Sequence, residues 1–156
     1  MANELSTAGV LVKYAVEQTA GTRPTTGYKT IPNIKSIPDL NPEPSTLEVT
    51  DLSDTEWKRY IPGLKDPGGA LSFGANNTDA FQADWDALVE AAETAKAANK
   101  STWFEIWIPG IAKSFFFAGI PSPLGLAAMD IDAVLEINAY ISPNEVEGWA
   151  AKSTTT

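Results

Sequence analysis

Apolar and polar residues alternate along much of the chain, and this period of two predicts β-strands. Residues 10–17 favour a strand, one face of which carries Val10, Val12, Tyr14 and Val16. Residues 45–50 predict a second strand with one wet face, and residues 69–75 predict a short third one. The longest alternation spans residues 130–141, where odd positions are apolar and the even positions include acids. We expect it to form a long, half-exposed strand.

Two aromatic segments, residues 102–108 and 113–120, predict a hairpin that turns at Pro109 and Gly110. Both faces of this hairpin are apolar. It is therefore expected either to lie between a helix and another sheet or to present a patch to a partner.

One helix is predicted over residues 79–98, because apolar residues recur there at alternating steps of four and three. The stripe consists of Phe81, Trp85, Leu88, Ala92 and Ala95. Asn77 or Thr78 is the expected N-terminal cap. A single apolar stripe of this kind indicates a surface helix laid on a sheet.

The stretch from Gly21 to Pro44 holds five prolines. Because each proline removes a backbone hydrogen-bond donor, we expect only edge strands and extended loop here. Residues 144–149 predict a short final strand, and residues 152–156 are a polar tail that is expected to fray.

The predicted fold class is mostly β, a β-sandwich or partly closed barrel with one flanking α-helix. The length of the chain suits one domain with its own core. We place this domain over residues 1–150 and a polar C-terminal tail over residues 151–156.

Residues 51–68 follow neither a strand nor a helix pattern. The segment mixes charges of both signs with Trp57, Tyr60, Ile61 and Leu64. Long loops in compact domains tend to be functional or disordered, and the large apolar residues argue against disorder. Two interpretations stay open, an Ω-loop folded back on its own domain and a docking arm for a neighbouring subunit. In the second, the interface candidates are Asp54, Trp57, Lys58, Arg59, Tyr60, Ile61, Pro62 and Leu64.

The chain contains neither cysteine nor histidine. Disulfides, thiolate metal sites and Ser-His or Cys-His nucleophiles are therefore excluded. Asp130 and Asp132 could contact a divalent cation, but the pair lacks the other oxygen ligands of a calcium site. Acids are numerous, yet no pair of them is marked out as a glycosidase pair. We expect no enzyme activity, no metal and no cofactor.

The net charge is −9, from 11 Lys and Arg against 20 Asp and Glu. This balance argues against binding nucleic acid by neutralising phosphates, and its plain interpretation is an acidic, solvated surface. The N-terminus has an acid where a signal peptide needs positive charge, and no apolar run reaches membrane-spanning length. We therefore expect synthesis in a cytoplasm and no membrane association.

The order of the segments carries a resemblance to a known family. The strand STLEVT at residues 45–50 is followed by DLSDTEWKRYIPGLKD at residues 51–66 and by a return strand from Gly69. This arrangement resembles the major tail tube proteins of long-tailed, siphovirus-type bacteriophages. The similarity continues in a single helix, paired strands beyond it and a long last strand, and it covers the chain from about Val10 to Trp149.

The resemblance implies a β-sandwich subunit of a virion tail, made in the host cytoplasm, that forms homo-hexameric rings stacked into a tube. Other tail proteins would join the tube ends, and DNA would pass through without specific binding. Six copies at −9 each give −54 per ring, and an acidic wall would repel phosphates. The candidates for acids that face the lumen are Glu48, Asp130, Asp132 and Glu136.

Two other functions stay open. A carbohydrate-binding β-sandwich would be a monomer that uses Trp57, Trp103 or Trp107 as sugar platforms. The tube protein of a contractile tail or of a secretion machine would share the expected fold and differ in having a sheath around it. The sequence does not decide among the three.

Overall fold

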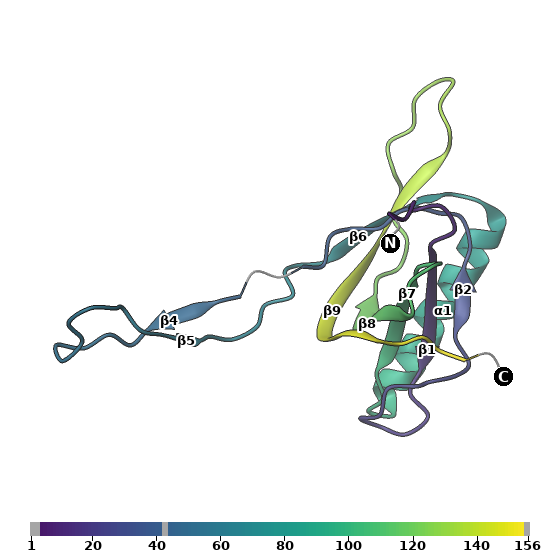
Figure 1. Cartoon of the computed structure of the whole chain (residues 1–156). Helices are drawn as coiled ribbons and strands as arrows, with labels where there is room; N and C mark the ends of the chain where they lie inside the picture. The colour runs from purple at the N-terminus through teal and green to yellow at the C-terminus, as the bar shows by residue number, and fades with distance from the viewer. Residues whose placement is uncertain (1–3, 42–43, 155–156) are drawn as a thin grey trace.

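The computed structural model describes residues 4–41 and 44–154, which form one large sheet, one helix and a projecting hairpin (Figure 1). The elements are β1 (Leu11–Val16), β2 (Lys29–Ile31), β3 (Ile34–Ser36), β4 (Thr46–Glu48), β5 (Tyr60–Pro62), β6 (Leu71–Asn76), α1 (Asp79–Ala97), β7 (Thr102–Trp107), β8 (Lys113–Pro121) and β9 (Glu136–Ala151). Seven strands form the sheet in the order β2-β1-β7-β8-β9-β6-β3, and it is nearly closed into a barrel. This architecture confirms the predicted fold class, mostly β with one flanking helix.

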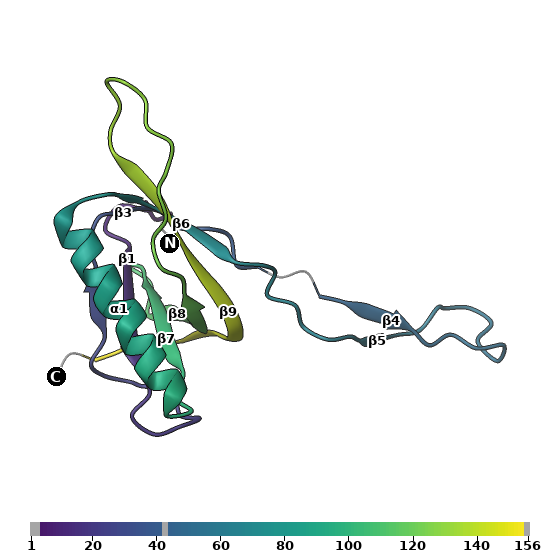
Figure 2. The same ribbon diagram turned by 180° about the vertical axis from the view of Figure 1, so that it is seen from behind.

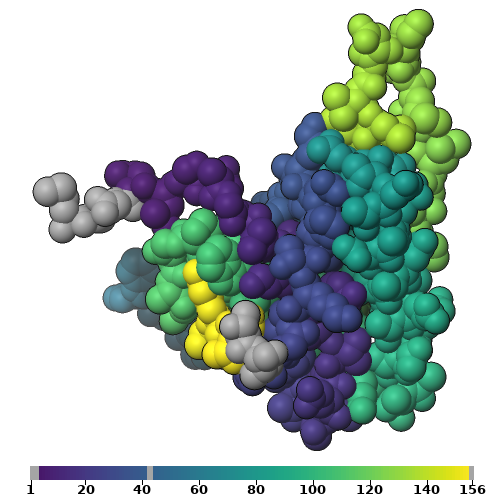
Figure 3. All heavy atoms as spheres, turned by 90° about the vertical axis from the view of Figure 1, so that its right-hand side faces the viewer, coloured from purple at the N-terminus to yellow at the C-terminus, as the bar shows by residue number. Residues whose placement is uncertain are grey.

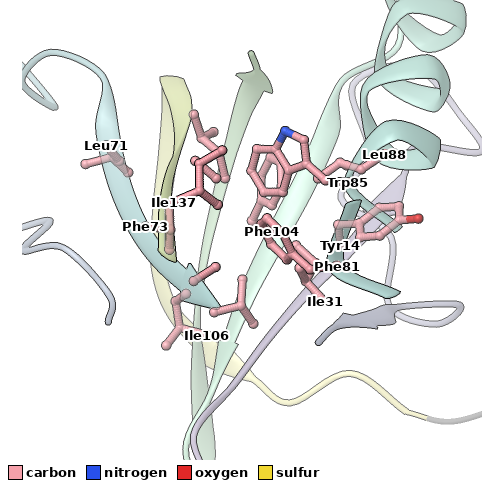
Figure 4. Close-up of a cluster of buried hydrophobic side chains, with 14 of the residues drawn as sticks. Tyr14, Ile31, Leu71, Phe73, Phe81, Trp85, Leu88, Phe104, Ile106 and Ile137 are labelled. Atoms are coloured by element: carbon pink, nitrogen blue, oxygen red, sulfur yellow. The ribbon is translucent and has the colours of Figure 1, made fainter. Parts of the chain in front are cut away.

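The helix α1 lies against one face of the sheet (Figure 2). Its cap is Thr78, whose hydroxyl accepts a hydrogen bond from the Phe81 backbone N–H at 3.2 Å. The predicted apolar stripe is buried as expected, and Phe81, Trp85 and Leu88 join Phe104 in the main core (Figure 4). These residues explain why a mostly β chain keeps one helix, since the stripe covers the inner face of the curved sheet.

The aromatic hairpin of β7 and β8 is buried on both faces, as its composition predicts. Phe104 and Phe117 stack at 5.3 Å between ring centroids on the core side. On the outer side, Trp103 and Phe116 form a second cluster, and the Arg23 guanidinium lies 4.0 Å from the Phe116 ring centroid. The loop before β2 therefore covers the outer face of the hairpin.

Two carboxylates are buried in this outer layer, and no pattern in the sequence marks either of them. Glu17 is 4% exposed and accepts hydrogen bonds from the Ser101 N–H at 2.8 Å and from the Trp103 indole at 3.0 Å. Burial raises the pKa of Glu17, but these bonds and one from the Gly21 N–H outweigh it, so the pKa is lowered overall. Glu105 is fully buried and accepts bonds from the backbone and hydroxyl of Ser153.

The prediction of a frayed polar tail is wrong for residues 152–154. The Lys152 ammonium donates to the Ile108 carbonyl at 2.7 Å and lies 4.0 Å from the Trp107 ring centroid. The Thr154 N–H then donates to the Thr25 carbonyl at 3.0 Å. Buried Glu105 needs the Ser153 donors, so this end of the chain is held against the body. The last two residues of the predicted tail lie outside the described residues.

The predicted strand over residues 130–141 is also wrong in its first half. Strand β9 begins at Glu136, and it continues past Ile141 to Ala151 as one strand with register shifts. Residues 130–135 have no neighbour to pair with, because β8 ends at Pro121 and the last pair of β6 is Asn76 with Glu136. Alternation alone does not make a strand when no partner edge is present.

The two sheet edges are short, as the prolines of residues 21–44 predict. Strands β2 and β3 have three residues each and lie at opposite ends of the sheet order. Ile31 is buried in the core, whereas Ile37 is 37% exposed.

In the described part of the chain, no helix is both long and apolar enough to span a membrane.

Candidate assembly surfaces

Residues 44–68, here called the arm, leave the body as a long hairpin (Figures 1 and 2). Strands β4 and β5 pair only with each other, in the register Thr46 with Pro62, Leu47 with Ile61 and Glu48 with Tyr60. The interpretation as an Ω-loop folded back on its own domain is therefore wrong. The single wet face predicted for the strand at residues 45–50 is also wrong, because Leu47 at the centre of β4 is 54% exposed.

The arm exposes large apolar side chains. Trp57 is 81% exposed and Leu64 is 91% exposed, while Tyr60 and Ile61 of β5 are about half exposed. Leu52, which is fully exposed, was not among the predicted interface residues. Leu52 lies between polar residues, Asp51 and Ser53, so no apolar pattern marks it. Apolar side chains gathered on a projection away from the core are the feature of the molecule that most needs a partner.

The tip of the arm is fixed by a polar network. The Arg59 guanidinium donates to Asp54 at 2.8 Å and to Asp51 at 3.2 Å, and its backbone N–H donates to the Thr50 hydroxyl at 2.8 Å. The hydroxyl and N–H of Ser53 both bond to Asp51 and lower the pKa of that carboxyl. Asp54 and Arg59, predicted as interface residues, thus bind each other and shape the tip that presents Trp57. The predicted contacts of Lys58 and Pro62 with a neighbouring subunit stay a prediction.

A second projection, here called the β8–β9 loop, consists of residues 122–135. Figure 3 shows it rising clear of the body. It exposes Leu126, Met129 and Ile131 at 85%, 61% and 96%. Its base is held by hydrogen bonds from the Ser122 N–H to the Tyr140 carbonyl and from the Asn77 N–H to the Leu135 carbonyl, both 2.9 Å. The prolines at its start were the signal in the sequence that could have identified a loop.

The four acids predicted to face a lumen do not share a strand face. Glu48 lies on β4 in the arm, while Asp130 and Asp132 lie on the β8–β9 loop. Asp132 has a backbone φ of 59°, which a strand does not allow. Glu136 is the first residue of β9 and forms an ion pair with Lys35. The strand face predicted to be shared by Asp130, Asp132 and Glu136 is therefore wrong, whereas the orientation of the four acids toward a lumen stays a prediction.

An apolar groove of about 390 Å³ opens where the base of the arm meets the body. Its lining includes Ile37, Pro38, Leu71, Ile106, Phe115 and Trp149. Figure 4 labels two of these lining residues, Leu71 and Ile106, on the side of the core away from α1. The groove thus lies between residues 37–41, which precede the arm, and strands β6, β7, β8 and β9.

The tryptophans proposed as sugar platforms are placed differently from one another. Trp103 is 3% exposed, so a sugar cannot stack on it. The Trp107 ring is contacted by the ammonium groups of Lys13 and Lys152, at 5.4 and 4.0 Å from its centroid. Trp57 alone of the three is freely exposed, and it lies on the arm.

Across residues 4–41 and 44–154, no group of three or more acidic side chains is placed to hold a metal ion.

The sequence matches no protein-family model, and a search of curated proteins found no relative. Among solved structures, a chain of the anti-feeding prophage (AFP) baseplate, a six-fold symmetrised cryo-EM structure, is similar with a TM-score of 0.58. The two chains are 8% identical, and the match covers 97% of this chain and 98% of that chain. A chain of the phage p2 baseplate in its activated conformation with Sr gives a TM-score of 0.45 at 7% identity, over 90% of this chain and 45% of that chain. The first match shows that this chain shares the fold of an AFP baseplate chain.

Proposed function

We propose that this chain is a structural subunit of a phage tail, or of a related tail-like particle, and that it assembles with copies of itself. The observation that carries the proposal is the arm, a rigid-tipped hairpin that leaves its own core and exposes Trp57 and Leu64. Interfaces are dominated by a few buried aromatic and other large anchors, and the arm offers such anchors on a projection. The fold shared with a chain of the AFP baseplate supports the same kind of assembly.

The finer form of the proposal is a homo-hexameric ring stacked into a tube, with other tail proteins at its ends. The arm supports it, because a projection that docks on an unlike surface of the next copy generates a ring or a continuing stack. The structure with the similar fold is six-fold symmetrised. A net charge of −9 suits a conduit that DNA passes without binding, because the wall gains no affinity for phosphates.

On this proposal the chain acts in the virion tail after synthesis in the host cytoplasm, and it catalyses no reaction. The absence of cysteine and histidine from the sequence supports a non-enzymatic role. The likeness to an AFP baseplate chain equally suits the second candidate, a tube protein of a contractile tail or secretion machine. A sugar-binding module loses support because Trp103 is buried and Trp107 is engaged by lysines.

Negative-stain microscopy of concentrated pure protein, with sedimentation velocity over a concentration series, tests the proposal. Rings or tubes, with a sedimentation coefficient that rises with concentration, are expected. A particle that remains a monomer at every concentration and is retained on polysaccharide resin would favour the sugar-binding module instead. A sheath that co-purifies with native tubes would select the second candidate over the first.

A further inference from the structure

We propose that the β8–β9 loop of one copy docks into the apolar groove of a second copy. The inference rests on the self-assembly proposed above and names a contact distinct from the arm. Outside the arm, the loop carries the most exposed large apolar side chains of the described residues, and the groove is lined almost wholly by apolar residues. The occupant is a second copy of this chain, and the contact is argued below from size, geometry and charge.

The groove has the volume and the apolar lining of a binding site. Its volume of about 390 Å³ lies within the roughly 300–1,000 Å³ of pockets that bind ligands. Its lining is almost wholly apolar and includes Ile37, Pro38, Phe115 and Trp149. Trp149 is 51% exposed, so a partner side chain entering the groove would cover aromatic surface that the monomer leaves in water.

The loop has the side chains to fill such a groove. Leu126, Met129 and Ile131 are apolar, of medium size and largely exposed. The base of the loop is fixed, because Leu124 and Ala127 contact the core and two backbone hydrogen bonds close it. A fixed base lowers the conformational entropy that docking would remove.

The loop and the groove lie at opposite ends of the same strands. The loop follows Pro121, the last residue of β8, whereas the groove is lined by Phe115 near the beginning of that strand. Six residues of β-strand span about 20 Å. Figure 1 shows the loop projecting away from the body, at the end of β8 opposite to Phe115. Contact between copies is therefore head to tail, and such a contact either closes into a ring or continues as an open stack.

Charge favours the same orientation. The loop contains Asp130 and Asp132 and has no lysine or arginine. Three lysines gather near the groove end of the sheet: Lys113 opens β8, Lys152 follows β9, and Lys13 lies with Lys152 at Trp107. Asp39, next to the lining residue Pro38, is an acid at this end. The lysines outnumber it, so an acidic loop approaching this end is attracted and correctly oriented.

The absence of cysteine from the chain makes a direct test possible. Two single variants, Met129→Cys in the loop and Ile37→Cys in the groove, are purified separately, mixed, assembled and treated with a short bismaleimide. Any link between the two variants joins different copies. Because docked sites hold the thiols at high effective concentration, this pair should link about tenfold faster than Met129→Cys with Lys96→Cys on the exposed face of α1. Mass spectrometry would identify the linked peptides.

Microscopy of the same mixtures separates the two proposals. Links between residues 129 and 37 in assembled particles support the contact. Assembled particles whose Met129→Cys thiol links to the groove no faster than to Lys96→Cys would overturn it while leaving self-assembly intact. Mixtures that never assemble, when the unmodified chain is also monomeric, would overturn the proposed function and this contact with it.

Discussion

Replacing Trp57 by alanine should strongly weaken assembly and leave the subunit folded. The side chain is 81% exposed on the arm, so the fold of the monomer gains little from it. The change in the free energy of unfolding should be below about 0.5 kcal/mol, as for other exposed positions. Ile61→Ala can be combined with it, since Ile61 is also on the arm and half exposed.

The cost to assembly follows from the area that a partner would cover. A buried aromatic side chain covers about 150–250 Å², and the 81% that is free in the monomer leaves about 120–200 Å² to be buried by a partner. At about 25 cal/mol per Å² this area corresponds to roughly 3–5 kcal/mol. Association and side-chain ordering reduce that figure, so we expect a loss of at least about 2 kcal/mol, or roughly a thirtyfold weaker contact.

Two measurements on the same sample separate folding from assembly. Circular dichroism with urea unfolding reports the stability, and sedimentation velocity reports the assembly. Trp85→Ala is the matched control, because Trp85 is fully buried and its loss should cost about 3–5 kcal/mol of stability. Lys96→Ala on α1 should leave both measurements unchanged.

Two results would contradict the reasoning. If Trp57→Ala unfolded the monomer as Trp85→Ala does, the arm would belong to the core of the subunit. If it assembled with the affinity of the unmodified chain, Trp57 would not be an anchor of the interface.

Three further predictions concern the polar contacts. Arg59→Ala should release the arm tip, so that amide hydrogen exchange accelerates around it while the urea midpoint stays within error. Ser153→Ala should lower the free energy of unfolding by about 1–3 kcal/mol, because buried Glu105 loses its hydroxyl donor. Glu17→Gln should make the free energy of unfolding fall less steeply in acid. Because the pKa of Glu17 is lowered in the fold, its carboxylate stabilises the protein above the ordinary pKa of 4.5. This contribution is lost as the pH falls through the pKa of the folded state.

Each of these has a result that would count against it. If amide hydrogen exchange at the arm tip is unchanged in Arg59→Ala, the backbone turn alone holds the tip. Unfolding of Ser153→Ala at the same urea concentration as the unmodified chain would mean that Glu105 finds another donor. An acid unfolding curve for Glu17→Gln as steep as the original would assign the pH dependence to other carboxylates.

The helix and the aromatic hairpin could be predicted because their signals are local. A stripe from Phe81 to Ala95 can only bury itself by lying on a sheet, and a strand pair with two apolar faces must be covered twice. The prolines before β4 likewise limit β2 and β3 to short edges. In each case the residues themselves carry the constraint.

The projections could not be predicted in this way, because they depend on where pairing stops. Residues 130–135 alternate as well as β9 does, yet no strand lies beside them, and their acids therefore do not form one face. The composition of residues 51–68 marks them as unusual, but it does not say whether the segment folds back on its own domain. The structure answers this, because β4 and β5 pair only with each other. Buried Glu17 and Glu105 were missed because acids are normally exposed, and only their distant donors make them tolerable.

The position of β9 in the sheet also sets the order in which the subunit can fold. Its first residues pair with β6 and the rest with β8, so β6 and β3 join the other strands only through β9. Residues 136–151 leave the ribosome after every other strand of the sheet, and pairing between such distant segments is slow in β-rich proteins. The base of the arm therefore stays unattached to the other strands of the sheet until β9 has been made. A nascent chain cannot present its arm in the final geometry before that point, so any contact made through the arm has to wait until β9 is in place.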